Sequence, residues 1–314
     1  CVCGGGGPGG SENHVGSLVA VFAAAAKLQM EEENPEDRIV FLIKKAKLST
    51  MKGDVAEADL FLHQALHLAQ EAHNTQAISY IYIQMANLSY IRGNLQNAEK
   101  LFKAAMTSLV GSGSQLDDNA LVEMSLKLAS IYATQKQHEL ATQGYRWCID
   151  TLEEKLHKQA SEPLPAEVVV DTQLLLGLCL DSFARYLIDK QQLKLAQSMY
   201  ERALAISQAV QGERHPQTVL LMNDLAAVLD MTGQQELAFQ CVSTALQLAR
   251  ETEHPHEHIL LNNLAGILLH RGDYTGAKRV YGQALRQAEE KQDKEAIQHI
   301  HEGLAELGAR TQSV

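Results

Sequence analysis

Histidines at short spacings are the first residues in this sequence whose types could support chemistry. His254, His256 and His258 alternate within five residues, and imidazole nitrogens are common zinc ligands. Alternating residues in a short turn point in diverging directions, however, and no cysteine lies nearby in the sequence. His63 and His67 have the i, i+4 spacing that two ligands on one helix can use, but they do not form the His-Glu-x-x-His pattern of zinc proteases. We therefore expect no metal site.

Two glycine-rich stretches resemble functional loops in composition alone. One has the composition of a phosphate-binding loop and the other that of a loop carrying a nucleophile. Residues 4–10 lack the preceding strand and the Lys-Ser or Lys-Thr pair of a phosphate loop. The segment Gly111-Ser112-Gly113-Ser114 lacks the closing glycine of a nucleophile elbow. No pair of nucleophile and base stands out in the sequence. We expect no catalytic residue, no cofactor and no small-molecule substrate, so the protein is not expected to be an enzyme.

Composition and charge narrow the class of partner. The 314 residues include 27 basic and 38 acidic side chains, which give a formal net charge of −11. Nucleic acid and anionic membrane surfaces both attract basic proteins, so we expect no nucleic-acid partner and favour a protein partner. Only 5% of the residues are aromatic while 46% are apolar, which favours helices over strands.

The amino-terminal end has a composition of its own. It begins at Cys1 and continues through Gly4–Gly10, which predicts a processed end from which a targeting segment has been removed, and a flexible Gly-rich and acidic segment over residues 1–35. The apolar run from Leu18 to Ala26 is far shorter than the ~20 residues of a membrane-spanning helix. The stretch Leu18–Leu28 could press on a membrane surface or pack onto the first folded element, and both alternatives stay open.

The elements that follow show an internal repeat. A turn dipeptide recurs six times, and five residues after its first member stands a central alanine: Ala58, Ala98, Ala141, Ala196, Ala238 and Ala277. Two more columns of small residues lie 12 residues before it and seven after it: Ala46, Ala86, Ala129, Ala184, Ala226 and Ala265, then Ala65, Ala105, Cys148, Ala203, Ala245 and Ala284. Antiparallel helices can cross closely only where side chains are small, so this pattern predicts pairs of packed helices. Larger residues four positions after the central alanine share its helix face and should fill the core.

This pattern resembles the tetratricopeptide repeat family over about Asp37 to Ala309. The resemblance implies an all-α, right-handed superhelical solenoid of about six helix pairs over residues 36–310, with a capping helix at the carboxyl end. It also implies a concave groove, lined by the first helix of each pair, that binds partners without catalysis. Asn34-Pro35 should cap the first helix of the solenoid, with Asn at the N-cap and Pro at the first helical position.

Residues three positions before the crossing alanine of each first helix, and one or four after it, should lie beside the groove. The expected partner-binding residues are Ile83, Asn87, Tyr90, Asp181, Arg185, Asn223 and Asn262. We expect Asn223 and Asn262 to hold one extended peptide backbone through their carboxamides. The alternative is that both residues only meet solvent.

The spacing between Ala141 and Ala196 is the longest between neighbouring central alanines, at 55 residues. It contains two prolines, so we expect a projecting loop over Leu156–Glu167. Pro163, Leu164 and Pro165 would present an extended apolar tip to a partner.

Two further resemblances concern function. The motifs Leu-Met-Asn-Asp-Leu-Ala (residues 221–226) and Leu-Leu-Asn-Asn-Leu-Ala (residues 260–265) are similar to the kinesin light chain subclass, which implies a cytosolic cargo or signalling adaptor. Over its whole length, including residues 34–47, 53–72 and 161–170, the chain resembles a mitochondrial branch of the tetratricopeptide repeat family. That resemblance implies peripheral association, through a partner, with the mitochondrial inner membrane. It also implies a scaffold that maintains respiratory complex III and helps to clear fragments of the Rieske iron-sulfur subunit.

Overall fold

The computed structural model describes residues 34–161 and 165–312, and within them the regular elements are all α-helices. The chain divides into two compact units, Cys1–Ser114 and Gln115–Val314, which are described separately here. Most of the expected Gly-rich segment, together with Pro163 and Leu164, lies outside the described residues.

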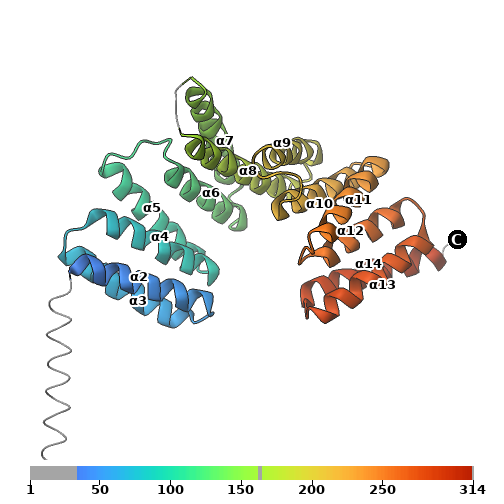
Figure 1. The fold of residues 1–314 in the computed structure, drawn as a ribbon, viewed down its shortest axis with the longest axis horizontal. Helices are drawn as coiled ribbons and strands as arrows, with labels where there is room; N and C mark the ends of the chain where they lie inside the picture. The colour runs from blue at the N-terminus through green and yellow to red at the C-terminus, as the bar shows by residue number, and fades with distance from the viewer. Residues whose placement is uncertain (1–33, 162–164, 313–314) are drawn as a thin grey trace, which may run out of the picture. The chain divides into compact units, whose positions relative to one another are not determined.

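Each unit is a series of antiparallel helix pairs joined by short turns (Figure 1). The first unit contains α2 (Pro35–Met51), α3 (Val55–Glu71), α4 (Thr75–Ile91) and α5 (Leu95–Gly111). The second unit contains α6 (Asn119–Thr134), α7 (His138–Gln159), α8 (Ala166–Asp189), α9 (Leu193–Gln211), α10 (Pro216–Met231), α11 (Gln235–Glu251), α12 (Glu257–His270), α13 (Tyr274–Glu290) and α14 (Lys294–Gln312). The prediction of six pairs followed by one carboxyl-terminal helix is therefore confirmed.

Polar side chains fix where many of these helices begin. The Asn34 side chain accepts a hydrogen bond from the Glu36 backbone N–H, and Pro35 occupies the first helical position as expected. Asp54 and Asn74 cap α3 and α4 in the same way, each accepting from the N–H three residues on. These caps satisfy backbone donors that would otherwise lack a partner at the helix start.

The turns within the pairs share one backbone feature. The first residue of each turn dipeptide has a positive φ: Gly53, Gly93, Lys136, Gln191, Gly233 and Gly272. Glycine adopts this left-handed conformation without steric penalty, whereas Lys136 and Gln191 adopt it at some cost. The turn geometry is thus conserved along the chain even where the residue type is not.

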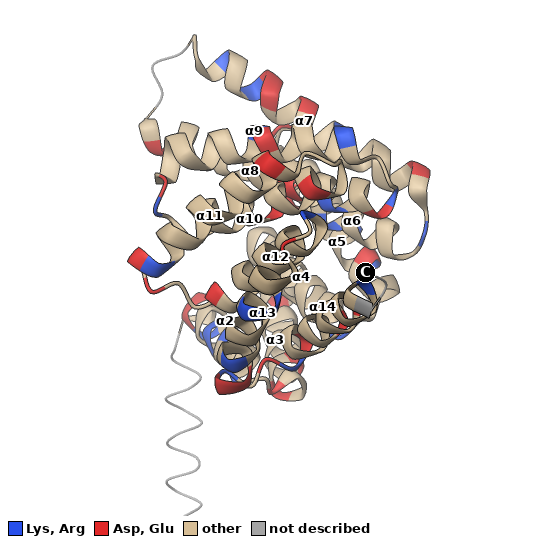
Figure 2. Cartoon of the chain, turned by 90° about the vertical axis from the view of Figure 1, so that its right-hand side faces the viewer, with Lys and Arg blue, Asp and Glu red and all other residues tan. Residues whose placement is uncertain are grey.

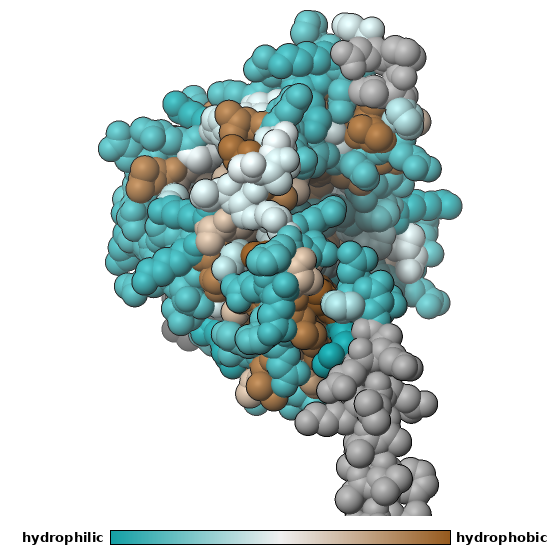
Figure 3. Space-filling view, turned by 90° about the vertical axis from the view of Figure 1, so that its left-hand side faces the viewer, coloured by the Kyte–Doolittle hydropathy of each residue, from teal (hydrophilic) through white to brown (hydrophobic). Residues whose placement is uncertain are grey.

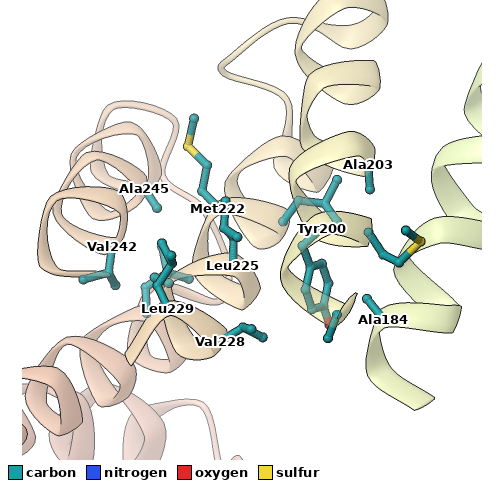
Figure 4. Close-up of a cluster of buried hydrophobic side chains, with 14 of the residues drawn as sticks. Ala184, Tyr200, Ala203, Met222, Leu225, Val228, Leu229, Val242 and Ala245 are labelled. Atoms are coloured by element: carbon teal, nitrogen blue, oxygen red, sulfur yellow. The ribbon is translucent and has the colours of Figure 1, made fainter. Parts of the chain in front are cut away.

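The small residues lie where the helices cross. All eighteen positions of the three columns are at most 2% exposed. Figure 4 shows part of this core in the second unit, where side chains from successive helices gather around the crossings, among them Ala184, Tyr200, Leu225 and Val242. The crossing role predicted for the alanines is confirmed.

The prediction of a loop over Leu156–Glu167 is wrong for half of that segment. The extra residues lengthen two helices instead: α7 has 22 residues and α8 has 24. Helical periodicity continues because Leu152 is buried and Leu156 packs against the core one turn later. Only the short connection from Ala160 to Pro165 remains, and Pro165 stands at the N-cap position of α8.

Candidate partner-binding site

The first helices carry the residues expected to bind a partner, and those of the first unit lie on α4. Ile83 and Asn87 are half-buried, and Tyr90 is 38% exposed. Asn87 lines a pocket of about 260 Å³ between α2 and α4, together with Met51 and Ile91. Both of these apolar side chains are mostly exposed, so this surface can bury apolar area against another protein.

The second unit brings Asp181 and Arg185 together on α8. Arg185 donates from Nε to Asp181 Oδ1 at 3.0 Å and from a terminal nitrogen to Oδ2 at 2.7 Å. The same guanidinium lies 3.8 Å from Asp224 Oδ2 on α10. One arginine therefore faces two carboxylates, which leaves the group with one uncompensated negative charge when both acids are ionised.

Hydrogen bonds extend this group to α12. Asn223 Nδ2 donates to Asp224 Oδ1 at 3.3 Å, and Asn263 Nδ2 donates to Asn223 Oδ1 at 3.0 Å. Asp181, Arg185, Asp224, Asn223 and Asn263 thus form a continuous polar chain across three successive first helices, which we call the polar ladder. Exposure differs between neighbouring members of the ladder, because Asp181 is buried while the Arg185 side chain is 61% exposed.

Burial disfavours the ionised form of both acids in the ladder. Burial raises the pKa of the Asp224 carboxyl to about 6, against the lowering effect of Arg185. Burial likewise raises the pKa of Asp181, again only partly offset by Arg185. Tyr200 on α9 lies near both acids, and burial followed by the charge of Asp224 raises the pKa of its hydroxyl. A further positive charge near Asp224 would stabilise its ionised form.

Asn223 and Asn262 do not form the expected pair of peptide-binding carboxamides. Asn223 is 2% exposed, and both ends of its amide are engaged within the ladder by Asn263 and Asp224. Asn262 lines a separate pocket of about 300 Å³ with Asp293 and other residues of α12 and α14, and its Oδ1 is buried without a hydrogen-bond partner. Asn223 therefore holds the ladder together, whereas the Asn262 carboxamide oxygen makes no hydrogen bond.

The sequence-based stripe missed Asp224 and Asn263. Both stand two positions before a crossing alanine, a position that the predicted stripe left out. The signal was present in the sequence, because Asn-Asp and Asn-Asn pairs occur at residues 223–224 and 262–263. Pro165 is exposed at the start of α8, apart from the contacts of the ladder.

The histidines have structural contacts instead of a shared centre. His258 is buried, and its Nε2 lies 2.9 Å from Asp293 Oδ2, while His254 Nδ1 accepts from the His256 backbone N–H. His63 Nδ1 lies 2.9 Å from the Asp59 carbonyl oxygen. In residues 34–161 and 165–312, no three His, Cys, Asp or Glu side chains are grouped so that they could hold a metal ion.

Charges of neither sign dominate the surface of the described helices. Figure 2 shows acidic and basic residues scattered over the helices. None of the helices in the described parts is both long and apolar enough to cross a bilayer. These surfaces suit contact with another protein through local patches.

Comparisons with known structures agree with the fold. The apo form of RapI superimposes with a TM-score of 0.66 at 15% identity, covering 94% of this chain and 82% of that chain. A signal transduction ATPase with a tetratricopeptide repeat sensor from Pyrococcus horikoshii also gives 0.66 at 14% identity, covering 91% and 43% of the two chains. At these identities the likeness concerns the fold alone.

Comparisons of sequence identify the family. Models of the tetratricopeptide repeat match residues 178–251 and 260–290. The chain is 48% identical to tetratricopeptide repeat protein 19, mitochondrial, of Rattus norvegicus, over 94% of this chain and 83% of that protein. It is 50% identical to the Homo sapiens protein of the same name, over 89% of this chain and 74% of that protein. The chain therefore belongs to the family of the mitochondrial tetratricopeptide repeat protein 19.

Proposed function

We propose that this protein is a non-catalytic scaffold that binds and maintains mitochondrial respiratory complex III and helps to clear fragments of the Rieske iron-sulfur subunit. Its repeats belong to an interaction fold, and its relatives are mitochondrial by name. Those names support a mitochondrial compartment over that of a cytosolic adaptor of the kinesin light chain type.

The polar ladder is the observation that carries the proposal. Its acids keep one negative charge that Arg185 does not compensate, and burial holds the pKa of Asp224 at about 6. A lysine or arginine side chain from a partner would supply the missing charge, and a charge-assisted hydrogen bond is among the stronger polar contacts. We infer that a basic segment of a complex III subunit docks on α8 and α10.

Exchange of one acid tests this inference. Asp224→Asn keeps the shape of the side chain and one acceptor oxygen but removes its charge. We expect this variant to retain less complex III when tagged protein is purified from detergent-solubilised mitochondria. Asp171→Asn is the matched control, because Asp171 is exposed and lies on α8 away from the ladder contacts. Equal recovery of complex III with both variants would refute docking at the ladder.

The connection between α7 and α8 is a second proposed contact. Pro163, Leu164 and Pro165 would present an apolar tip between two helix ends. Replacing residues 161–165 with a Gly-Ser linker should weaken co-purification with complex III while thermal unfolding stays nearly unchanged, since short connections add little to stability. Unchanged co-purification would exclude a binding role for this connection.

Peripheral attachment to the inner membrane completes the proposal. If a protein partner provides the attachment, alkaline carbonate should release the protein from mitochondrial membranes. Detergent should be needed only when complex III itself is to be extracted. Retention in the carbonate pellet would contradict attachment through a partner alone.

A further inference from the structure

An open apolar groove lies at the start of the first unit. It has a volume of about 800 Å³ and is lined from α2 by Arg38, Phe41 and Lys45, and from α3 by Phe61 among others. Phe41 is 55% exposed, and the Lys45 ammonium lies 4.7 Å from the centre of its ring. Figure 3 shows brown, hydrophobic areas interrupting the hydrophilic surface on the side of the molecule where this unit lies. Such an exposed aromatic surface marks a docking site.

The equivalent surface is covered in later repeats. Phe41 stands five residues before the crossing alanine of its helix, and the residues at the same position in later first helices are Ile81, Met124, Cys179, Leu221 and Leu260. Each of these is at most 3% exposed. The exposure of Phe41 therefore arises from its place at the start of the series, where the described residues include no preceding helix.

Contacts in the second unit show which positions of a preceding second helix would cover the groove. Cys179, at the position of Phe41, is buried beside Cys148, which stands seven residues after the central alanine of α7. In α9, Ser207 stands eleven residues after the central alanine, four residues beyond the position that Cys148 has in α7. Its Oγ lies 2.7 Å from Thr218 Oγ1 in α10. A small residue at the first of these positions leaves room for the side chain of the following helix.

The sequence upstream of α2 has the register of such a second helix. Leu18 precedes Asn34, the N-cap of α2, by 16 residues, as Ala58 precedes the N-cap Asn74 and Ala277 precedes Asp293. In this register the large residue of the core column falls on Phe22, and the small residue that would face Phe41 falls on Ala25: the segment reads Val-Gly-Ser-Leu-Val-Ala-Val-Phe-Ala-Ala-Ala-Ala-Lys-Leu-Gln-Met over residues 15–30.

We propose that residues 15–33 dock in the α2–α3 groove as the second helix of a preceding half-repeat, with Ala25 against Phe41. Charge supports this occupant, because the segment ends in Glu31-Glu32-Glu33 and the groove presents Arg38 and Lys45. The segment ends next to Asn34, the N-cap of α2, in the sequence, so it needs no long linker to reach the groove. The groove is thus an internal docking site that completes the repeat series.

Thiol protection tests the register directly. In the full chain with Cys1→Ser and Cys3→Ser, Ala25→Cys should react with a soluble maleimide roughly tenfold more slowly than Ala24→Cys, since a docked thiol reacts only after local opening. Position 24 is the matched control, because the equivalent residues Gln64, Ala104 and Thr244 are exposed. Peptide mass spectrometry reads each site separately from the three remaining cysteines.

A groove variant then ties the protection to α2. Phe41→Ser removes a side chain that is more than half exposed, and it should raise the reactivity of Ala25→Cys to that of Ala24→Cys. Equal reactivity at the two positions before this change, or protection that persists after it, would overturn the proposal. Protection that disappears on dilution would show a second copy in the groove, and protection that requires lipid vesicles would show a membrane surface there; either result also overturns it.

Hydrogen exchange gives an independent measure on the groove itself. Backbone amides of α2 should exchange faster in Ala25→Glu than in Ala24→Glu, because only the first substitution places a carboxylate against Phe41. Identical exchange of α2 in the two variants would contradict docking.

Discussion

Removing the charge of Asp224 should stabilise the second unit at neutral pH. The pKa of this carboxyl is raised by burial to about 6, from 3.8 for the unperturbed group. The folded state therefore prefers the protonated acid, so this group stabilises the fold below pH 3.8 and loses that contribution as the pH rises towards 6. Above pH 6 the ionised carboxylate carries a constant cost, which Asp224→Asn should remove.

The size of this effect follows from the shift. Each pKa unit corresponds to about 1.4 kcal/mol, so a shift of roughly two units sets a ceiling near 3 kcal/mol. The Asp224 side chain is 31% exposed, and solvent screening lowers the effect, so we expect about 1–2 kcal/mol. The corresponding rise in melting temperature is roughly 2–8 °C for a unit of this size.

Thermal and urea unfolding at pH 7.5 and pH 4.5 measure the effect. The gain of Asp224→Asn over the unmodified protein should be present at pH 7.5 and shrink at pH 4.5, where the folded acid is already protonated. Asp171→Asn removes an exposed carboxylate of the same unit and should change stability little at either pH. A loss of stability at pH 7.5, or a gain that grows at pH 4.5, would refute the electrostatic reasoning.

Three further predictions concern the turns, a histidine and catalysis. Gln191→Gly should stabilise the second unit by roughly 0.5–1 kcal/mol in urea unfolding, because φ is 57° there, whereas Gln192→Gly, at a negative φ, should not. Burial, and then the charge of His256, lower the pKa of His254, so the stability that this residue contributes is present above the unfolded pKa near 6.5 and is lost as the pH falls. His254→Gln should therefore make the free energy of unfolding less dependent on pH between pH 7.5 and 5.5. An unchanged pH dependence would contradict this prediction. The purified protein should leave Rieske subunit fragments intact over hours by gel and mass spectrometry, and cleavage with turnover would identify an enzyme.

The fold could be predicted from the sequence because each helix pair repeats the same local requirement. A central alanine with a turn five residues earlier identifies a crossing, and Asn34-Pro35 identifies the first described helix start. The spacing between Ala141 and Ala196 was misread, because prolines signal an interruption without saying where a helix stops. The buried Leu152 and the adjacent turn of Leu156 extend α7 up to the connection.

The candidate site was predicted less completely, because hydrogen bonds between helices depend on rotations of a few tens of degrees. The helical stripe correctly placed Asp181 and Arg185 together. It paired Asn223 with Asn262, whereas the contact is made by Asn263, the next residue along α12. Sequence spacing gives the helix face to within about one residue, and neighbouring residues on a helix point about 100° apart.

Within each unit, helices pack mainly on their neighbours in the sequence, which affects how the chain folds and unfolds. Contacts between neighbouring helices join segments that are close in the sequence. Folding can therefore start at any stable helix pair and spread to the adjacent helices before distant segments meet. By the same logic, damage to one pair should melt that pair and loosen its neighbours while the rest of the unit stays folded. A partner that binds α8 and α10 would therefore also stabilise α9, which packs on both helices. Binding should slow backbone amide exchange well beyond the residues that the partner contacts.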